Sequence, residues 1–274
     1  MILNNAVLDA EFYAFISFVY FRIREKFIHS YEKENLRELV NLRRGLPMET
    51  ELSSEAEEYV EAIYKIQKRS NVAKTNELAK ELHVVPGSIT NTIAHLEKHG
   101  LVKHEPYRGV KLTTKGEMLA LEILRKHRLA ERLLTDILNA EWSEVHESAC
   151  KLEHALTKEV IMLLEKRLEK PKFCPHGNPI PTEHGEVEEE ECCPLTKMDL
   201  NKASVISKIT DEKRKKLTTL AKKGIKPNVP IHVVERNPSN IVLCVAGKEC
   251  TLSYDDASSV WVKLIKVSKH AVQK

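Results

Sequence analysis

The sequence predicts an α+β protein with an N-terminal winged helix-turn-helix domain, a central all-α segment and a small C-terminal β-barrel. Three observations lead to this prediction. Apolar residues recur at helical spacing from Ser53 to about residue 168. Two short helical patterns around a tight turn are followed directly by two strand patterns. After residue 200, five short β-rich segments alternate with turns of Gly, Asn and Pro, as in small barrels.

The helical pattern begins at an N-cap, Ser53 or Ser54, and runs to about Lys68. Gly100 ends the second helix of the helix-turn-helix motif, because glycine tolerates the left-handed backbone that closes a helix. The motif and its wing are expected as helices at 75–82 and 88–99 and strands at 101–104 and 110–113. The remaining helices are expected within 114–139, 143–156, 157–168 and 211–223, and the remaining strands at 203–209, 231–235, 241–245, 249–253 and 260–265.

Composition favours a soluble, helix-rich protein. The chain is 42% hydrophobic and 30% charged, with only 9 Gly and 11 Pro in 274 residues. Its net charge of +3 is too small to indicate a partner by itself. Six cysteines without a regular framework favour reduced, intracellular thiols. The apolar segment Phe12–Phe21 is too short to cross a bilayer as a helix. We therefore expect a cytoplasmic protein with no membrane partner.

Residues 1–47 differ from the rest of the chain, and two interpretations stay open. They can form an extra N-terminal helix that packs on the body or on a partner. Alternatively, Met48 is the true initiator, because Arg43, Arg44 and Gly45 can be encoded by a purine-rich tract resembling a ribosome-binding site. The nucleotide sequence would decide between them.

Polar and basic residues in the helix-turn-helix motif predict a DNA interface. The second helix presents side chains that can reach base edges or phosphates: Ser88, Thr90, Asn91 and His95. Basic residues at the end of this helix and in the wing can contact phosphates: Lys98, Arg108 and Lys111. Winged helices also serve in protein–protein contacts, but the agreement of motif, wing and basic character favours DNA.

Two groups of metal-ligand residue types lie about twenty residues apart. His127 and Glu131 are one helical turn apart. The second group falls on one continuous helix face: His146, Cys150, Glu153 and His154. Mixed N, S and O donors suit a first-row transition ion better than Ca²⁺ or Mg²⁺. The alternatives are a surface His–Glu pair and a half-buried helix with polar residues. Two packed helices could instead place both groups around one or two ions.

No sequence motif indicates catalysis. The chain has no HExxH motif, no paired acid/base motif and no glycine-rich loop for phosphate. We therefore expect neither an enzyme nor a small-molecule substrate. A metalloenzyme or metal-delivery module is the alternative from a different class, and it would need an open coordination position beside a catalytic base.

Three stretches resemble the diphtheria-toxin-repressor family of metal-dependent regulators: Arg125–Ile137, Val145–His154 and Gly177–Pro181. The resemblance covers the chain from about residue 50 to the C-terminus. It implies a DNA-binding winged helix, a helical metal-binding and dimerisation domain, and a C-terminal barrel similar to SH3 and FeoA domains. The expected divisions are 1–47 (extension), 48–115 (DNA binding), 116–172 (metal binding and dimerisation), 173–194 (linker) and 195–268 (barrel).

The resemblance also implies two metal sites per subunit. His127, Glu131 and His146 match one site. Cys150, Glu153 and His154 match the other, which a residue on the first helix completes. Glu58 stands at that position, where iron-type members carry Met, and Glu61 lies one turn further on. In the barrel domain, Glu212 is a weaker candidate ligand for the His127 site.

The donors leave the physiological metal open. Carboxylates at residues 58 and 61 resemble the manganese-type branch, whereas Cys150 resembles the iron type. Hard oxygen donors favour Mn²⁺ or Fe²⁺, and a thiolate shifts preference toward Fe²⁺ and later metals. We favour Fe²⁺ over Mn²⁺.

The sequence therefore predicts a metal-dependent transcriptional repressor that binds a pseudo-palindromic operator as a homodimer. A regulator in which the metal is only structural stays an alternative. Gly87 and Asn91 stand where relatives with known operators carry other residues, so the operator sequence is not predicted.

The predicted linker also carries donors: Cys174, His176, His184, Cys192 and Cys193. They can form an additional metal or redox site, but a flexible linker with inert thiols is the favoured interpretation.

Overall fold

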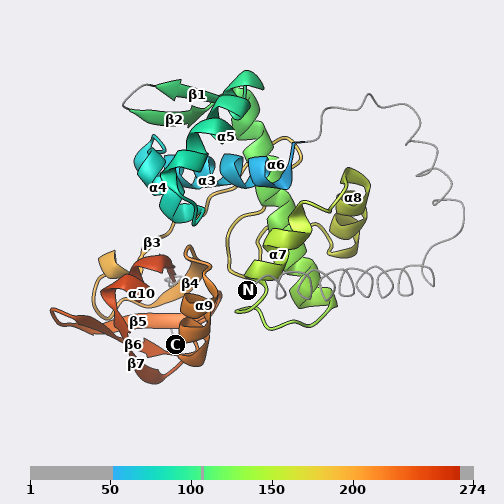
Figure 1. Ribbon diagram of the computed structural model, residues 1–274. Helices are drawn as coiled ribbons and strands as arrows, with labels where there is room; N and C mark the ends of the chain where they lie inside the picture. The colour runs from blue at the N-terminus through green and yellow to red at the C-terminus, as the bar shows by residue number, and fades with distance from the viewer. Residues whose placement is uncertain (1–51, 106–107, 266–274) are drawn as a thin grey trace, which may run out of the picture. The chain divides into compact units, whose positions relative to one another are not determined.

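The computed structural model describes residues 52–105 and 108–265, which belong to one compact unit beginning at Leu52 (Figure 1). The expected extension 1–47 and the alternative initiator Met48 lie outside the described residues. The expected start of the DNA-binding domain at residue 48 and the expected end of the barrel at residue 268 also lie outside them. No helix of the described part is long and apolar enough to cross a membrane.

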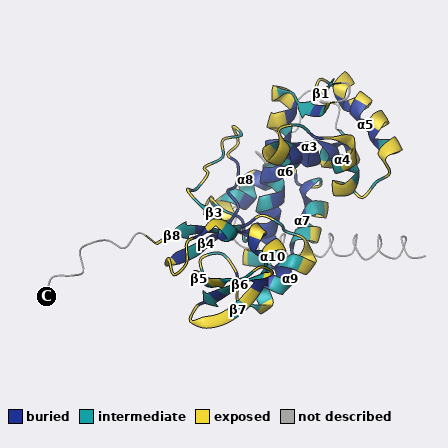
Figure 2. Ribbon diagram, turned by 90° about the vertical axis from the view of Figure 1, so that its left-hand side faces the viewer, coloured by how far each residue is buried: buried dark blue, intermediate teal, exposed yellow. Residues whose placement is uncertain are grey.

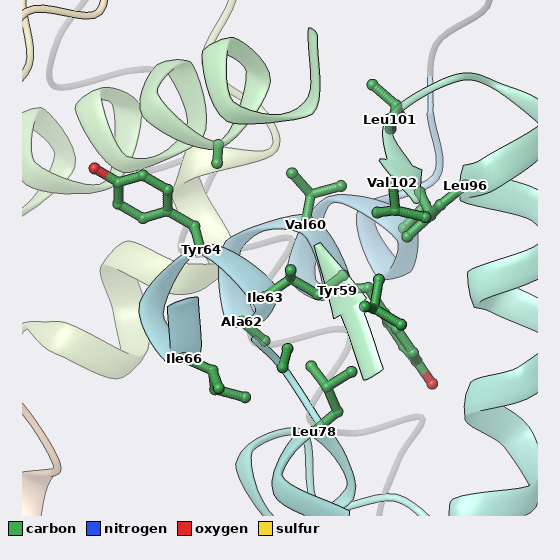
Figure 3. Close-up of a cluster of buried hydrophobic side chains, with 14 of the residues drawn as sticks. Tyr59, Val60, Ala62, Ile63, Tyr64, Ile66, Leu78, Leu96, Leu101 and Val102 are labelled. Atoms are coloured by element: carbon green, nitrogen blue, oxygen red, sulfur yellow. The ribbon is translucent and has the colours of Figure 1, made fainter. Parts of the chain in front are cut away.

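Helix α3 (Ser54–Ser70) is the centre of the winged helix domain. Its N-cap is Ser53, whose side chain accepts a hydrogen bond from the backbone N–H of Ala56. Asn71 ends it in the left-handed conformation. Its apolar residues Tyr59, Ile63 and Ile66 are buried, and Figure 3 shows them in the core.

Helices α4 (Thr75–Glu81) and α5 (Pro86–Lys98) form the helix-turn-helix. Strands β1 (Val102–Glu105) and β2 (Gly109–Leu112) pair antiparallel as the wing. These elements confirm the expected order. Helix α5 begins two residues earlier than predicted because Pro86 occupies its first position, where a missing N–H costs nothing. Leu78, Leu96, Leu101 and Val102 join the core of α3 (Figure 3).

The central domain is helical. Helix α6 (Thr114–Arg132) continues into a π-helical turn, Leu133–Ile137, followed by α7 (His146–Glu153) and α8 (Lys158–Arg167). Helix α6 contacts α3, α7 and α8, so this single helix connects the DNA-binding domain to the metal-ligand residues. Its start fits closely against the wing, because a Cβ on Gly116 would lie 2.0 Å from the Leu101 carbonyl oxygen. Figure 2 shows the buried positions along α3 and α6.

The C-terminal domain is a six-stranded antiparallel sheet with its own core. The strand order is β3-β8-β4-β5-β6-β7. Its strands are β3 (Cys193–Pro194), β4 (Ser204–Ile209), β5 (Pro230–Arg236), β6 (Asn240–Val245), β7 (Lys248–Ser253) and β8 (Val260–Leu264). Helix α9 (Arg214–Lys222) was expected. The short helix α10 (Tyr254–Ser259) was not expected, and it contacts both edge strands, β3 and β7.

The expected linker is ordered in its first half, which corrects the interpretation of a flexible segment. Cys174, His176 and Asn178 are buried. Gly177 has φ +82°, and a Cβ there would lie 2.0 Å from the Ser207 carbonyl oxygen of β4. Glycine is therefore required both for the backbone conformation and for the close approach to β4.

Candidate metal centre

The metal-ligand residues of α6 and α7 meet in the interior. His127 and Glu131 on α6 are 1% and 0% exposed, and Glu153 on α7 is 1% exposed. Charged residues are rarely buried this completely unless they are paired or bind a metal. The predicted face of α7 thus packs on the predicted face of α6.

His127 contacts three other members of this cluster. Its Nδ1 donates to Glu153 Oε2 at 2.6 Å. Its Nε2 lies 3.1 Å from Glu131 Oε1 and 3.2 Å from His146 Nδ1. The Cys150 Sγ is 3.8 Å from His146 Nε2. His127, His146 and Cys150 converge closely enough for their ligand atoms to share one ion.

These contacts group the ligand residues differently from the two expected sites. Cys150 lies with His127 and His146 rather than with His154. Glu153 converges with His127 and with Glu61 of α3.

The structure does not bring Glu58 into any of these groups. Glu58 is exposed, and His154 Nδ1 instead donates to Glu57 Oε2 at 2.6 Å. Around helix α3, residue 61 lies between residues 57 and 58, so a sequence pattern alone cannot tell which neighbour turns inward. Glu61, the weaker candidate, is 6% exposed.

The C-terminal domain contributes Glu212. Glu212 Oε2 is 3.5 Å from His146 Nδ1, and Glu212 converges with His127, Glu131 and His146. This weaker sequence candidate is therefore in place, although all four residues after it, Lys213 to Lys216, are Lys or Arg.

The first half of the linker adds Cys174 and His176, which converge with Glu131 of α6 and Glu212 of the C-terminal domain. His176 Nδ1 is 3.0 Å from Glu131 Oε1 and 3.6 Å from Glu212 Oε1. The signal was the Cys-Pro-His sequence beside the Gly-Asn-Pro stretch, which the sequence interpretation set aside. Among the described residues, His184, Cys192 and Cys193 join no such group, and the His184 side chain is 78% exposed.

Opposite charges shift the pKa values of this cluster against the effect of burial. Burial alone would lower the pKa of His127, but Glu131 and Glu153 raise it well above its ordinary value. Burial opposes the same change at His146, yet Cys150 and Glu131 raise the pKa of His146 to about 9. Glu131 shows the reverse: burial would raise its pKa, and His127 and His176 hold it well below its usual range.

Several buried polar atoms have no hydrogen-bond partner among the described residues, and they fit a bound cation. Glu131 Oε2, His154 Nε2 and His176 Nδ1 are such atoms. His176 Nε2 donates to the Trp142 carbonyl oxygen at 2.8 Å. In the neutral ring, Nδ1 then presents a lone pair toward the Glu131 carboxylate, an arrangement that needs a proton or a metal ion between the two atoms. The mixed N, O and S donors fit a first-row divalent ion.

The DNA-binding residues predicted on α5 lie mostly on its surface. Thr90, Asn91, His95 and Lys98 are exposed. Ser88 is half-buried, and its hydroxyl donates to the Val85 carbonyl oxygen at 2.9 Å, which occupies it within the turn.

In the wing, Arg108 is exposed and Lys111 is half-buried. His99 was not predicted. The centroids of the His99 and His95 rings lie 4.3 Å apart, so His99 adds a second imidazole to this surface.

Three family models match the chain in succession. "Iron dependent repressor, N-terminal DNA binding domain" matches residues 51–110, and "Iron dependent repressor, metal binding and dimerisation domain" matches residues 113–182. The FeoA domain model matches residues 193–264.

Similar curated proteins carry consistent names. The iron-dependent repressor IdeR of Mycobacterium tuberculosis H37Rv is 30% identical over 229 residues, covering 78% of this chain and 99% of the relative. The diphtheria toxin repressor of Corynebacterium diphtheriae is 30% identical over 223 residues, covering 78% of this chain and 98% of the relative.

Solved structures share the fold. A manganese-dependent transcriptional repressor in complex with manganese aligns with a TM-score of 0.72 and 28% identity, covering 77% of this chain and all of that one. The IdeR of T. acidophilum aligns with a TM-score of 0.66 and 27% identity, covering 81% of this chain and all of that one.

Proposed function

Because the chain belongs to the diphtheria-toxin-repressor family of metal-dependent transcriptional regulators, we propose that it binds a pseudo-palindromic DNA operator as a homodimer when loaded with Fe²⁺ or Mn²⁺. The observation that carries this proposal is the buried group of N, O and S donors. It joins α3 of the DNA-binding domain, helices α6 and α7, and the C-terminal domain. A divalent ion bound there would link the three domains through their own side chains.

The donors support two neighbouring sites. On the side of α3, Glu61 and Glu153 converge with His127, and Cys150 converges with His127 and His146. Glu61, His127, Glu153 and Cys150 would together hold one ion, with Glu57 and His154 beside them. On the side of the C-terminal domain, Glu131, Cys174, His176 and Glu212 would hold the other. His146 lies close to both groups, 3.2 Å from His127 and 3.5 Å from Glu212.

Fe²⁺ suits the donor set best. Each site combines carboxylates with imidazole and a thiol, and a thiolate shifts preference from Mn²⁺ toward Fe²⁺. The names of the relatives include both iron-dependent and manganese-dependent repressors. Mn²⁺ is therefore the second candidate.

The acidic side chains of α3 explain how a bound cation would control DNA binding. Glu61 and Glu153 come from different domains and are both buried beside His127. The cation would neutralise the repulsion between these carboxylates. The orientation of α3 relative to α7 would then be fixed, and with it the orientation of α5 on DNA. An ion that binds this conformation more tightly than the alternatives shifts the protein toward it, and so controls DNA binding.

The helical domain supports the homodimer. Residues 113–182 match a model described as a metal-binding and dimerisation domain, and Met162 on α8 is 68% exposed. Two copies related by a two-fold axis would place their recognition helices one helical turn of DNA apart, or a multiple of it.

A mobility-shift titration tests the proposal. We expect tight binding of operator DNA with Mn²⁺ or anaerobic Fe²⁺, and loss of binding when a chelator removes the ion. Binding that is equally tight with the chelator would leave the metal only a structural role.

A further inference from the structure

We propose that Asn178 is a positioning residue that aims the Glu212 carboxylate at the metal centre and so makes the C-terminal domain part of that centre. This inference rests on the proposed site formed by Glu131, Cys174, His176 and Glu212. It concerns a residue that is not itself a ligand. Residues 173–180 are held between two domains.

Both ends of this segment are anchored on α6. The Arg132 side chain donates to the Phe173 carbonyl oxygen at 2.7 Å, and the Arg128 side chain donates to that of Pro179. Within the segment, Phe173 and Pro179 form an antiparallel bridge. These contacts close the segment into a tight loop on the helix that carries His127 and Glu131.

The tip of the loop lies against β4 of the C-terminal domain. The backbone N–H of Ile209 donates to the His176 carbonyl oxygen at 2.9 Å. The position of Gly177 against Ser207 leaves no room for a Cβ, as described above. The loop therefore joins the metal-binding helices to the strand that leads into Glu212.

Asn178 connects the two sets of ligands. Its side-chain amide donates to Glu212 Oε1 at 2.6 Å and to the Ile209 carbonyl oxygen at 2.8 Å. Its backbone carbonyl accepts from the N–H of Cys174 at 2.9 Å. Asn178 is 7% exposed, so water does not compete freely for these contacts.

The consequence is a fixed carboxylate. Glu212 lies outside the regular elements, between β4 and α9, and its side chain would otherwise be free to turn toward solvent. With Oε1 held by Asn178, Oε2 faces His146 at 3.5 Å. Hydrogen-bonded partners of this kind orient metal ligands, and their loss typically costs about 10- to 100-fold in metal affinity.

The test uses Co²⁺, whose thiolate charge-transfer absorption reports coordination by cysteine. The full chain carrying Cys150→Ser is titrated, so that Cys174 is the remaining thiol of the described ligand groups. Adding Asn178→Leu removes both amide donors at similar volume. We expect the Co²⁺ affinity to fall about 10- to 100-fold and the charge-transfer band to change. Thermal melting in chelator checks that the variant folds, and Asn178→Ser replaces it if it does not.

A double-mutant cycle with Glu212→Gln separates positioning from general support. If Asn178 acts through Glu212, its substitution changes the Co²⁺ affinity by less than about twofold once Glu212 is replaced. An unchanged affinity in Asn178→Leu alone, or an equal loss in both backgrounds, contradicts the inference. If the starting protein shows no Co²⁺ band that Cys174→Ser removes, the proposed site itself is wrong, and the role of Asn178 falls with it.

Discussion

At the level of single residues, the metal-ligand types could be read from the sequence, but their grouping could not. Helical spacing predicted that His127, Glu131, His146 and Glu153 face one interior, and all four contribute to it. Spacing within one helix carries no information on which side chains of two helices meet. Cys150 therefore joins His127 in the structure, although it was expected beside His154.

Lys65 is paired with the candidate ligand Glu61. Its ammonium lies 3.0 Å from Glu61 Oε1, and its pKa is raised, against the effect of burial, by Glu61 and Glu212. A cation at this position repels an incoming metal ion and competes with it for Glu61. We expect Lys65→Gln to tighten metal binding several-fold, up to about tenfold.

Lys68→Gln, on the same helix but exposed, is the matched control for Lys65→Gln. It removes an equal charge without touching Glu61. Isothermal titration calorimetry with Mn²⁺ at low and high salt measures both variants. Equal affinities in Lys65→Gln and the wild type would show that this ammonium does not compete for the site.

Metal binding is expected to release protons from the histidine ligands. Glu131, Cys150 and Glu153 raise the pKa of His127 well above its ordinary value, and Cys150 with Glu131 raises that of His146 to about 9. Both rings are therefore positively charged at pH 7 in the absence of a metal ion. A ligand imidazole must be deprotonated, so metal binding should release about one to two protons per subunit and tighten as pH rises from 6 to 8. Calorimetry in buffers of different ionisation enthalpy counts them. Binding without proton release would exclude both histidines as ligands.

At the level of elements, the sequence predicted the helix-turn-helix, the wing and five of the six strands of the C-terminal sheet within a few residues, but not the two-residue strand β3 in the expected linker. N-caps and turn residues carried this information, as at Ser53 and Gly100. The short helix α10 was missed because Tyr254–Ser259 has few apolar residues and lies between two strands. Residues 173–180 were taken for a linker because their order comes from contacts with α6 and β4 rather than from local propensity.

Helix α5 carries a prediction about DNA. Asn91 is exposed and can bond to a base edge, so Asn91→Ala should weaken operator binding by about 1–3 kcal/mol and spare non-specific DNA. Lys98 can contact phosphate, so Lys98→Ala should weaken binding to every sequence and reduce the salt dependence by about one unit of slope. Fluorescence anisotropy at several salt concentrations measures both effects. Identical losses on operator and random DNA for Asn91→Ala would rule out base recognition by this residue.

At the level of the whole molecule, the order of three domains and a ligand from the first helix were predictable, but the α3 residue that joins the ligand groups, Glu61 rather than Glu58, was not. Glu61 and Glu212 were the weaker candidates, yet both are in the buried groups. Each comes from a different domain from His127, and contacts between domains depend on tertiary packing. The loop around His176 was set aside for the same reason. Together these residues place the candidate metal centre at the junction of all three domains.

We propose that the α3 carboxylates Glu57 and Glu61 couple metal binding to DNA binding. The most direct test measures operator affinity with Mn²⁺ and with chelator for the wild type and for Glu57→Gln/Glu61→Gln. We predict a large metal dependence in the wild type. In the variant, we predict loss of that dependence, while metal binding at the group containing Cys174 and His176 is retained. A variant that still needs Mn²⁺ for operator binding to the same extent as the wild type would contradict the claim.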